Sequence, residues 1–161
     1  MTAPPWHPPS ASPGDLMTTA APPLDQPYYG APLGAAIRRV LAKYATFPGR
    51  ASRSEYWWWV LTAAVVGTVL NALPTLTDGI RIEADGSTTI TGPLGVILGL
   101  IWLVWALATI VPTLAVLVRR LHDTDRSGFW IFIGLIPLVG PVILLVFTVQ
   151  ASRPGGARFD R

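Results

Sequence analysis

Three apolar runs without a single charged residue constrain this chain more than any other feature. They cover residues 56–76, 94–118 and 129–149, and they are 21, 25 and 21 residues long. At a rise of about 1.5 Å per residue, a helix of this length reaches about 30 Å, the thickness of the hydrocarbon core of a bilayer. Because lipid offers no hydrogen bonds, such a run must satisfy its own backbone, as a helix does. The runs therefore predict membrane-spanning helices.

The composition supports a membrane protein and excludes several kinds of site. Hydrophobic residues make up 51% of the 161 residues and charged residues 13%, whereas a typical soluble domain has about 25% charged residues. A soluble fold of this size cannot bury so much apolar surface. The chain has no cysteine, which excludes disulfides, thiolate metal sites and cysteine nucleophiles.

The third run differs from the first two because Pro137, Gly140 and Pro141 lie near its centre. Proline and glycine weaken or break a helix, and each half is too short to cross a bilayer alone. The run is therefore either one kinked span or a re-entrant hairpin. We expect an all-α integral membrane fold, a small multi-pass helical bundle with two spans and a kinked or re-entrant third.

The part of the chain before the first run divides in two. Residues 1–32 contain nine of the sixteen prolines, which predicts a disordered proline-rich arm. Residues 33–47 repeat apolar side chains at helical spacing, with Arg38, Arg39 and Lys43 largely on other faces. This pattern predicts an N-terminal interfacial amphipathic helix with its bases near anionic headgroups. The alternative is an ordinary amphipathic helix packed on protein.

The first span has a well-defined start. Ser52 and Glu55 have the S-x-x-E spacing of a capping box, in which each side chain satisfies a free amide at a helix start. Residues 57–59 are three tryptophans, the aromatic side chains typical of headgroup depth. We therefore expect the span to enter the membrane here.

The distribution of lysine and arginine predicts the orientation. Residues 33–55 contain five, the loop 77–93 one, and the segment 119–128 three. By the positive-inside rule, the amino terminus and the 119–128 segment are cytoplasmic. The polar tail, 152–161, has three more arginines, and a third full span would place them outside. This conflict favours a re-entrant third segment at the end of a membrane domain that covers residues 33–151.

The segment "RRLHDTDRSG" between the second and third runs allows a chemical interpretation. His122, Asp123 and Asp125 have the side chains for binding a divalent metal or for acid–base chemistry. The spacing is poor for either purpose, because the one other histidine in the chain is His7, in the proline-rich arm. The sequence also has no H-E-x-x-H, Walker, dinucleotide or G-x-S-x-G motif.

A structural interpretation accounts for more of these residues. Arg119 and Arg120 close the second span, where cations suit the negative end of a helix dipole. Glu55 would pair with one of these two arginines, and the two aspartates would pair with arginines nearby. This interpretation predicts a cytoplasmic polar network of nine charged residues: Arg50, Arg53, Glu55, Arg119, Arg120, His122, Asp123, Asp125 and Arg126.

Three stretches together point to a family. "FPGRASRSEYWWW", "VRRLHDTDRSGFWIFIGLIPLVG" and the tail "RPGGARF" closely resemble the small bacterial inner-membrane family known as domain of unknown function 805. The resemblance covers residues 33 to about 160. It implies a multi-pass inner-membrane protein of unassigned activity, and it carries over no catalytic residues. The tail departs from the family pattern at Ala157, where asparagine is usual, and at Asp160, where glycine is usual.

From these observations we expect an uncharacterised multi-pass protein of the bacterial inner membrane, with a cytoplasmic amino terminus. Its expected role is that of a non-catalytic scaffold or partner subunit, with no catalytic, metal-binding or cofactor-binding residues assigned. The alternative is a membrane-surface enzyme or an anionic-lipid headgroup binder using the His122 segment, and the third possibility is a small permease. The expected partners are anionic membrane lipids and either a second copy or another membrane protein, and not nucleic acid.

Overall fold

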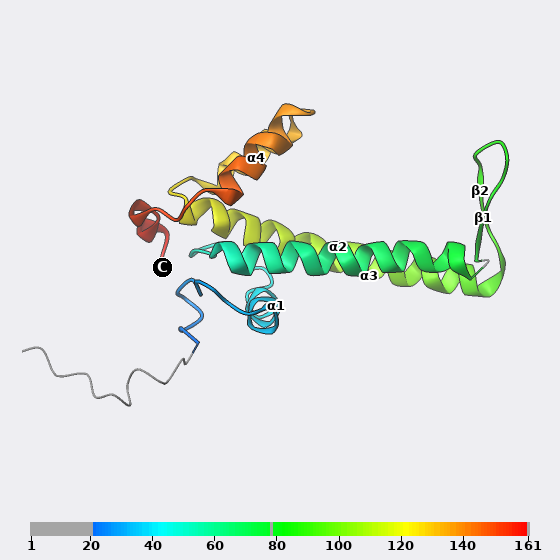
Figure 1. The fold of residues 1–161 in the computed structure, drawn as a ribbon, viewed down its shortest axis with the longest axis horizontal. Coiled ribbons are helices and arrows are strands. Elements are labelled where there is room, and N and C mark those ends of the chain that lie inside the picture. The colour runs from blue at the N-terminus through cyan, green and yellow to red at the C-terminus, as the bar shows by residue number, and fades with distance from the viewer. Residues whose placement is uncertain (1–20, 78, 161) are drawn as a thin grey trace, which may run out of the picture.

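The computed structural model describes residues 21–77 and 79–160, and two long helices dominate it. Helix α2 (Arg53–Leu76) and helix α3 (Gly92–Asp123) have 24 and 32 residues, and they run side by side in opposite directions (Figure 1). Both are long and apolar enough to cross a membrane. The capping box is confirmed: the Ser52 hydroxyl accepts a hydrogen bond from the Glu55 amide, and the Glu55 carboxylate accepts one from the Ser52 amide.

Helix α3 extends past the predicted end of the second run at Val118. The residues Arg119 to Asp123 form its last turns, so most of the charged segment is helical and not a loop. Nothing in this stretch opposes a helix, and cations are favourable at a helix C-terminus. The helix ends at Asp123, just before Asp125 adopts a φ of 62°.

The C-terminus of α2 and the N-terminus of α3 are joined by a β-hairpin, where the sequence predicted a loop. Strand β1 (Ile80–Ile82) pairs antiparallel with β2 (Thr88–Ile90), with Ile80 opposite Ile90. The turn between them contains Gly86 with a φ of 83°, a backbone conformation that glycine adopts without strain. The fold is therefore not purely α-helical.

The third apolar run forms a hairpin instead of one continuous helix. A 3₁₀ helix, η1 (Gly128–Leu135), is followed by helix α4 (Val139–Val149), which packs back on it at an angle to the long pair (Figure 1). A Cβ on Gly140 would lie 1.9 Å from the Ile133 carbonyl oxygen, so only glycine permits this close crossing. The chain then returns to its starting end, where the Arg153 amide donates to the Asp123 carbonyl at 2.9 Å.

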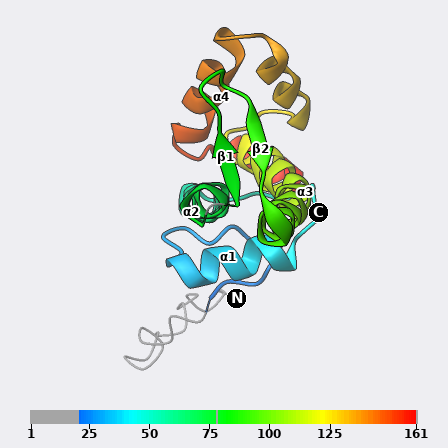
Figure 2. The same cartoon turned by 90° about the vertical axis from the view of Figure 1, so that its right-hand side faces the viewer.

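Helix α1 (Leu33–Ala42) lies across α2 and α3, as Figures 1 and 2 together show. It is shorter than the predicted 33–47 helix. Its Val40 packs with Ala51, Trp59 and Val116 in a small buried core. The core thus lies at one end of the long helix pair.

Residues 21–32, predicted as part of a disordered arm, pack against α1 and the start of α2 in the structure. The Arg39 guanidinium donates to the Pro22 and Pro23 carbonyls at 2.7 and 3.0 Å, and the Tyr28 amide donates to Glu55. The rest of the predicted arm, residues 1–20, lies outside the described residues.

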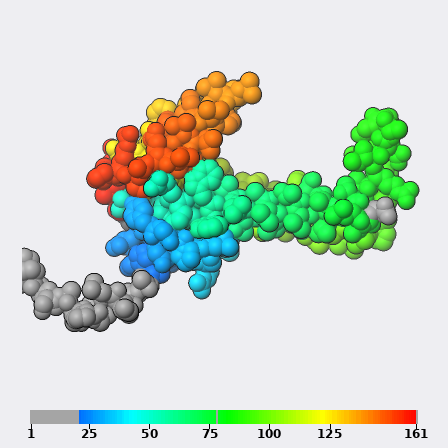
Figure 3. Space-filling view, viewed as in Figure 1, coloured from blue at the N-terminus to red at the C-terminus, as the bar shows by residue number. Residues whose placement is uncertain are grey.

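The tail forms a second 3₁₀ helix, η2 (Pro154–Phe159), and packs at the same end as α1. The Gly49 amide donates to the Phe159 carbonyl at 2.9 Å. The long helices instead project from this end as a narrow rod tipped by the β-hairpin (Figure 3). Large apolar side chains along the rod, such as Leu61, Val65 and Leu100, are about half exposed, as expected for a surface that lipid covers.

Candidate functional site: a buried polar cap

Charged and polar side chains gather at the end of the α2–α3 pair that is opposite the β-hairpin. Four segments meet there, and we call them together the cap: residues 21–32, 43–55, 119–127 and 148–160. Most of the buried charged residues of the described chain lie in the cap or on α1 beside it. The cap is therefore the strongest candidate for a functional site.

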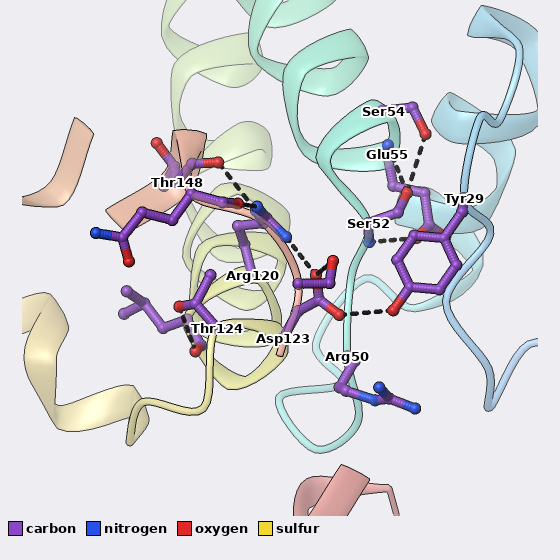
Figure 4. Close-up of polar contacts among 12 residues, drawn as sticks. Tyr29, Arg50, Ser52, Ser54, Glu55, Arg120, Asp123, Thr124 and Thr148 are labelled. Atoms are coloured by element: carbon purple, nitrogen blue, oxygen red, sulfur yellow. Dashed lines mark hydrogen bonds and ion pairs between the residues drawn. The ribbon is translucent and has the colours of Figure 1, made fainter. Parts of the chain in front are cut away.

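The centre of the cap is an ion pair between Arg120 and Asp123, whose side chains are both fully buried. The Nε of Arg120 donates to the Thr148 carbonyl at 3.0 Å, and its Nη2 donates to the Gln150 carbonyl. Figure 4 shows the guanidinium between Asp123 and the end of α4. Arg120 thus fastens the last turn of α3 to the last turn of α4.

Asp123 extends the same connection to two more segments. Its carboxylate accepts hydrogen bonds from the Tyr29 hydroxyl at 2.9 Å and from the Ser152 hydroxyl, in addition to the pair with Arg120 (Figure 4). Burial, and then the negative charge of Asp123, raise the pKa of Tyr29. We call Tyr29, Arg120, Asp123 and Ser152, with the two carbonyls that Arg120 binds, the clamp.

A second buried ion pair joins Glu55 and Arg39. The distance from Arg39 Nε to Glu55 Oε1 is 2.7 Å, and Oε2 accepts hydrogen bonds from the Ser52 and Tyr28 amides at 2.8 and 3.2 Å. The predicted partner of Glu55 was Arg119 or Arg120, and this is wrong. Arg39 was predicted to lie near lipid headgroups, but it is buried in the protein, as is Lys43.

Two further ion pairs connect the tail to the other segments of the cap. Arg50 Nε donates to both oxygens of Asp160, at 2.9 and 3.0 Å, and Arg158 lies 3.0 Å from Asp125. Hydrogen bonding to Asp160 raises the pKa of Arg50. Arg50 and Asp125 were both predicted in the polar network, but their partners are tail residues that the prediction did not include.

His122 serves as a packing and hydrogen-bonding group. Its Nδ1 lies 3.0 Å from the Gly49 carbonyl, and its ring stacks on Phe159 with centroids 4.1 Å apart. It lines an open cavity of about 680 Å³ together with Ser127 and Arg158. Within residues 21–77 and 79–160, no three histidine, aspartate or glutamate side chains converge as a metal site would require.

The remaining predicted residues lie apart from the clamp. Arg53 is exposed beside Trp57 and Trp58, and the guanidinium of Arg126 lies 3.9 Å from the centre of the Phe147 ring. Arg119 is 2% exposed, and its Nε donates to the Ala115 carbonyl at 3.3 Å. The predicted residues thus share one end of the molecule but form several separate interactions.

Sequence reasoning missed several residues that complete these interactions: Tyr28, Tyr29, Arg39, Thr148, Ser152, Arg158 and Asp160. Tyr28 and Tyr29 were overlooked because the prolines around them predicted disorder. An adjacent pair of aromatic residues could have indicated that this segment packs on the protein. The tail residues belong to a stretch that carries the family resemblance, and this resemblance could have indicated that the tail is part of the fold.

Comparison with known proteins identifies a family and two similar proteins. A family model described as "Protein of unknown function (DUF805)" matches residues 44–161. Inner membrane protein YhaH of Escherichia coli (strain K12) is 40% identical over 121 residues, which cover 75% of this chain and 89% of the relative. Inner membrane protein YhaI of the same organism is 37% identical over 120 residues, 74% of this chain and 87% of the relative. No solved structure matches the chain.

Proposed function

The chain belongs to the protein family of unknown function DUF805, and we propose that it acts in the bacterial inner membrane as a non-catalytic scaffold or partner subunit. The observation that carries this proposal is the clamp. Arg120 and Asp123 use their hydrogen-bonding groups on one another, on Tyr29, on Ser152 and on two carbonyls of the α4 end. Groups that are fully buried and bonded in this way hold chain segments together, which is a structural role.

In the proposed arrangement, α2 and α3 cross the bilayer, and η1 with α4 forms a re-entrant hairpin. The distribution of basic residues supports it. The long pair has the five lysines and arginines of residues 33–55, those of residues 119–126, and Arg153 and Arg158 of the tail around one end, whereas the β-hairpin end has Arg81. With a re-entrant hairpin the tail is cytoplasmic, and every basic cluster then satisfies the positive-inside rule.

We further propose that α1 lies in the membrane interface. Leu33, Leu41 and Tyr44 form an exposed apolar stripe on or just beyond this helix. The Tyr44 hydroxyl donates to the Ala108 carbonyl at 2.6 Å, about two helical turns farther from the cap than Val116. The stripe therefore faces along α3 toward the hydrocarbon core, as the apolar face of an interfacial helix does.

Labelling of single cysteines tests this topology, and the absence of native cysteine makes it direct. Ala151 is exposed and outside the clamp, and Ser87 is exposed in the β-hairpin. In intact cells, a membrane-impermeant thiol reagent should label Ser87→Cys through the outer membrane pores, and should label Ala151→Cys only after the cells are opened. Labelling of Ala151→Cys in intact cells would mean that the third segment spans the membrane.

A charge exchange tests the scaffold role of the clamp. Arg120→Ala and Asp123→Ala should each lower the yield of folded protein, because each leaves a buried charge without its partner. The double variant Arg120→Asp, Asp123→Arg should recover part of that yield, measured by size-exclusion chromatography of a fluorescent fusion. Single variants that fold with normal yield would contradict a structural role and leave these groups free for chemistry.

A further inference from the structure

The first turns of α2 carry an open groove at the edge of the cap. Its volume is about 570 Å³, and its lining residues form two rows with a spacing of four residues: Arg53, Trp57 and Leu61 in one row, and Ser54 and Trp58 in the other. Residues four apart lie on the same face of a helix. The groove therefore runs along α2 for about 12 Å, from Arg53 to Leu61.

The groove faces away from the neighbouring helix α3. Trp59 is 2% exposed, and its Nε1 donates to the Thr113 hydroxyl of α3 at 3.0 Å. At about 100° per residue, Trp57 and Leu61 lie about 160° around the helix from Trp59. In the proposed arrangement this side of α2 meets the membrane, so a lipid is the molecule that the groove would contact.

The groove contains a cation without a partner in the described chain. The Arg53 guanidinium forms no ion pair or hydrogen bond with any group of that part of the chain. Ser54 is different, because its hydroxyl accepts a hydrogen bond from the Ala31 amide at 2.9 Å. Glu55, the nearest acidic residue in the sequence, is buried and paired with Arg39. The charge of Arg53 is therefore available to an external anion.

Trp57 and Trp58 give the middle of the groove an amphipathic wall. Both side chains are just over one third exposed. An indole ring packs on apolar chains, and its N–H donates to polar groups, which suits the depth of lipid headgroups. Leu61, one turn beyond Trp57, is half exposed and purely apolar. Polarity thus falls along the groove from Arg53 to Leu61, in the order in which a phospholipid runs from its phosphate to its acyl chains.

We propose that this groove binds one anionic phospholipid, with the phosphate on Arg53 and the upper acyl chains along Trp57, Trp58 and Leu61. The guanidinium is a directed donor to phosphate oxygens. An anionic lipid is favoured over a zwitterionic one, because its headgroup has no net cation that competes with Arg53. The proposal rests on the proposed arrangement in which α2 crosses the bilayer. It differs from the headgroup site predicted near His122, since the groove is lined by residues of α2 alone.

The test measures which lipids remain bound to the purified full-length chain. The protein is placed in detergent micelles with equal amounts of phosphatidylglycerol and phosphatidylcholine, and bound lipids are counted by native mass spectrometry. The wild type should retain one phosphatidylglycerol in preference. Arg53→Gln should weaken this preference about fivefold, as expected for the loss of one exposed charge pair. Arg38→Gln is the matched control, since it removes an exposed arginine of α1 and should keep the preference.

A second variant distinguishes a groove from a lone charge. Trp57→Ala combined with Trp58→Ala keeps Arg53 but removes the walls, and should also lose the retained lipid. Size-exclusion elution and Tm check that each variant is folded. The proposal is overturned if the wild type prefers neither lipid, or if the Arg53 variant or the double tryptophan variant retains phosphatidylglycerol as the wild type does. Equal loss in Arg38→Gln would overturn it as well, because the attraction would then be a property of the whole basic end.

The lipid measurement and the cysteine labelling fail separately. Labelling of Ala151→Cys in intact cells would overturn the re-entrant hairpin but would leave Arg53 at the same surface of the bilayer, so the lipid preference should remain. Conversely, a chain that retains neither lipid in preference would overturn the groove and leave the labelling pattern unchanged.

Discussion

Asp123 and Glu55 are both buried carboxylates at the ends of long helices, yet different donors surround them. Asp123 is surrounded by side chains, from Arg120, Tyr29 and Ser152, whereas Glu55 combines Arg39 with two backbone amides. In each case one carboxylate joins segments that are far apart in the chain. At the scale of the residue, the partners in these two buried ion pairs thus depend on one another.

Removing the Glu55 side chain tests this dependence. Glu55→Ala should destabilise the fold by about 3–5 kcal/mol, because it leaves Arg39 buried without its partner and also removes half of the capping box. Thermal or denaturant unfolding in detergent measures the loss. Arg158→Ala is the control, since this arginine is largely exposed and its pair with Asp125 should contribute at most about 1 kcal/mol. Equal losses for the two variants would contradict the distinction between buried and exposed pairs.

The Tyr29 hydroxyl predicts a dependence on alkaline pH. Burial and the nearby Asp123 raise its pKa above the ordinary value of 10.0, so folding favours the neutral phenol. The stabilising effect is fully present below pH 10 and is lost as the pH rises through the pKa of the folded state. The Tm of the wild type should therefore exceed that of Tyr29→Phe by a constant amount at neutral pH, and the difference should shrink above pH 10. A difference that does not change with pH would show that Tyr29 contributes only by packing.

At the scale of the element, the hairpin of η1 and α4 determines where the tail lies. Pro137 and Pro141 prevent one continuous helix, but this leaves both a kinked span and a hairpin possible. The hairpin requires close contact at Gly140, where α4 meets the Ile133 carbonyl. Leu138 turns the chain between the two elements with a φ of 65°, a strained conformation for a residue other than glycine.

Adding one methyl group at this crossing should open the hairpin. Gly140→Ala places a Cβ where the Ile133 carbonyl lies, and overpacking of this kind costs about 1–3 kcal/mol. Gly134→Ala is a suitable control, because its Cβ would meet a methyl group of the Leu144 side chain, which can move. The Tm of each purified variant is measured, and Gly140→Ala should have the lower Tm. A Gly140→Ala protein as stable as the wild type would show that the elements do not need this contact.

At the scale of the whole molecule, the tail closes the cap over the segments before it. Gly156 lies against the end of α3, where an added Cβ would come within 2.5 Å of the His122 carbonyl. The nearby ion pairs of Arg50 with Asp160 and of Arg158 with Asp125 hold the same tail. The amino-terminal segment, the long helices and the carboxyl terminus therefore depend on one another at a single end.

Displacement of the tail should be detectable by proteolysis. Gly156→Ala should release the tail from the cap, and trypsin should then cleave after Arg158 several times faster than in the wild type, while the long helices remain intact. The bond after Arg153 precedes Pro154 and resists trypsin. Mass spectrometry of the cleavage products provides the measurement. Ala157→Ser serves as the control, since Ala157 is exposed. Unchanged cleavage of Gly156→Ala would mean that the tail does not need this close contact.

By itself, the sequence determined the membrane character, the two long helices, the capping box at Ser52 and two of the four segments of the cap, residues 43–55 and 119–127. These features follow from local properties, namely length without charge, residue spacing and turn chemistry, and each can be read within about twenty neighbouring residues. The partners of those residues were decided only by the tertiary structure. The sequence favoured Arg119 or Arg120 as the partner of Glu55, whereas the structure pairs it with Arg39, and Asp123 could pair with any of several arginines. Which pair forms depends on where α1 crosses the long helices and on the return of the tail, because buried charges are satisfied by the donors that folding brings to them.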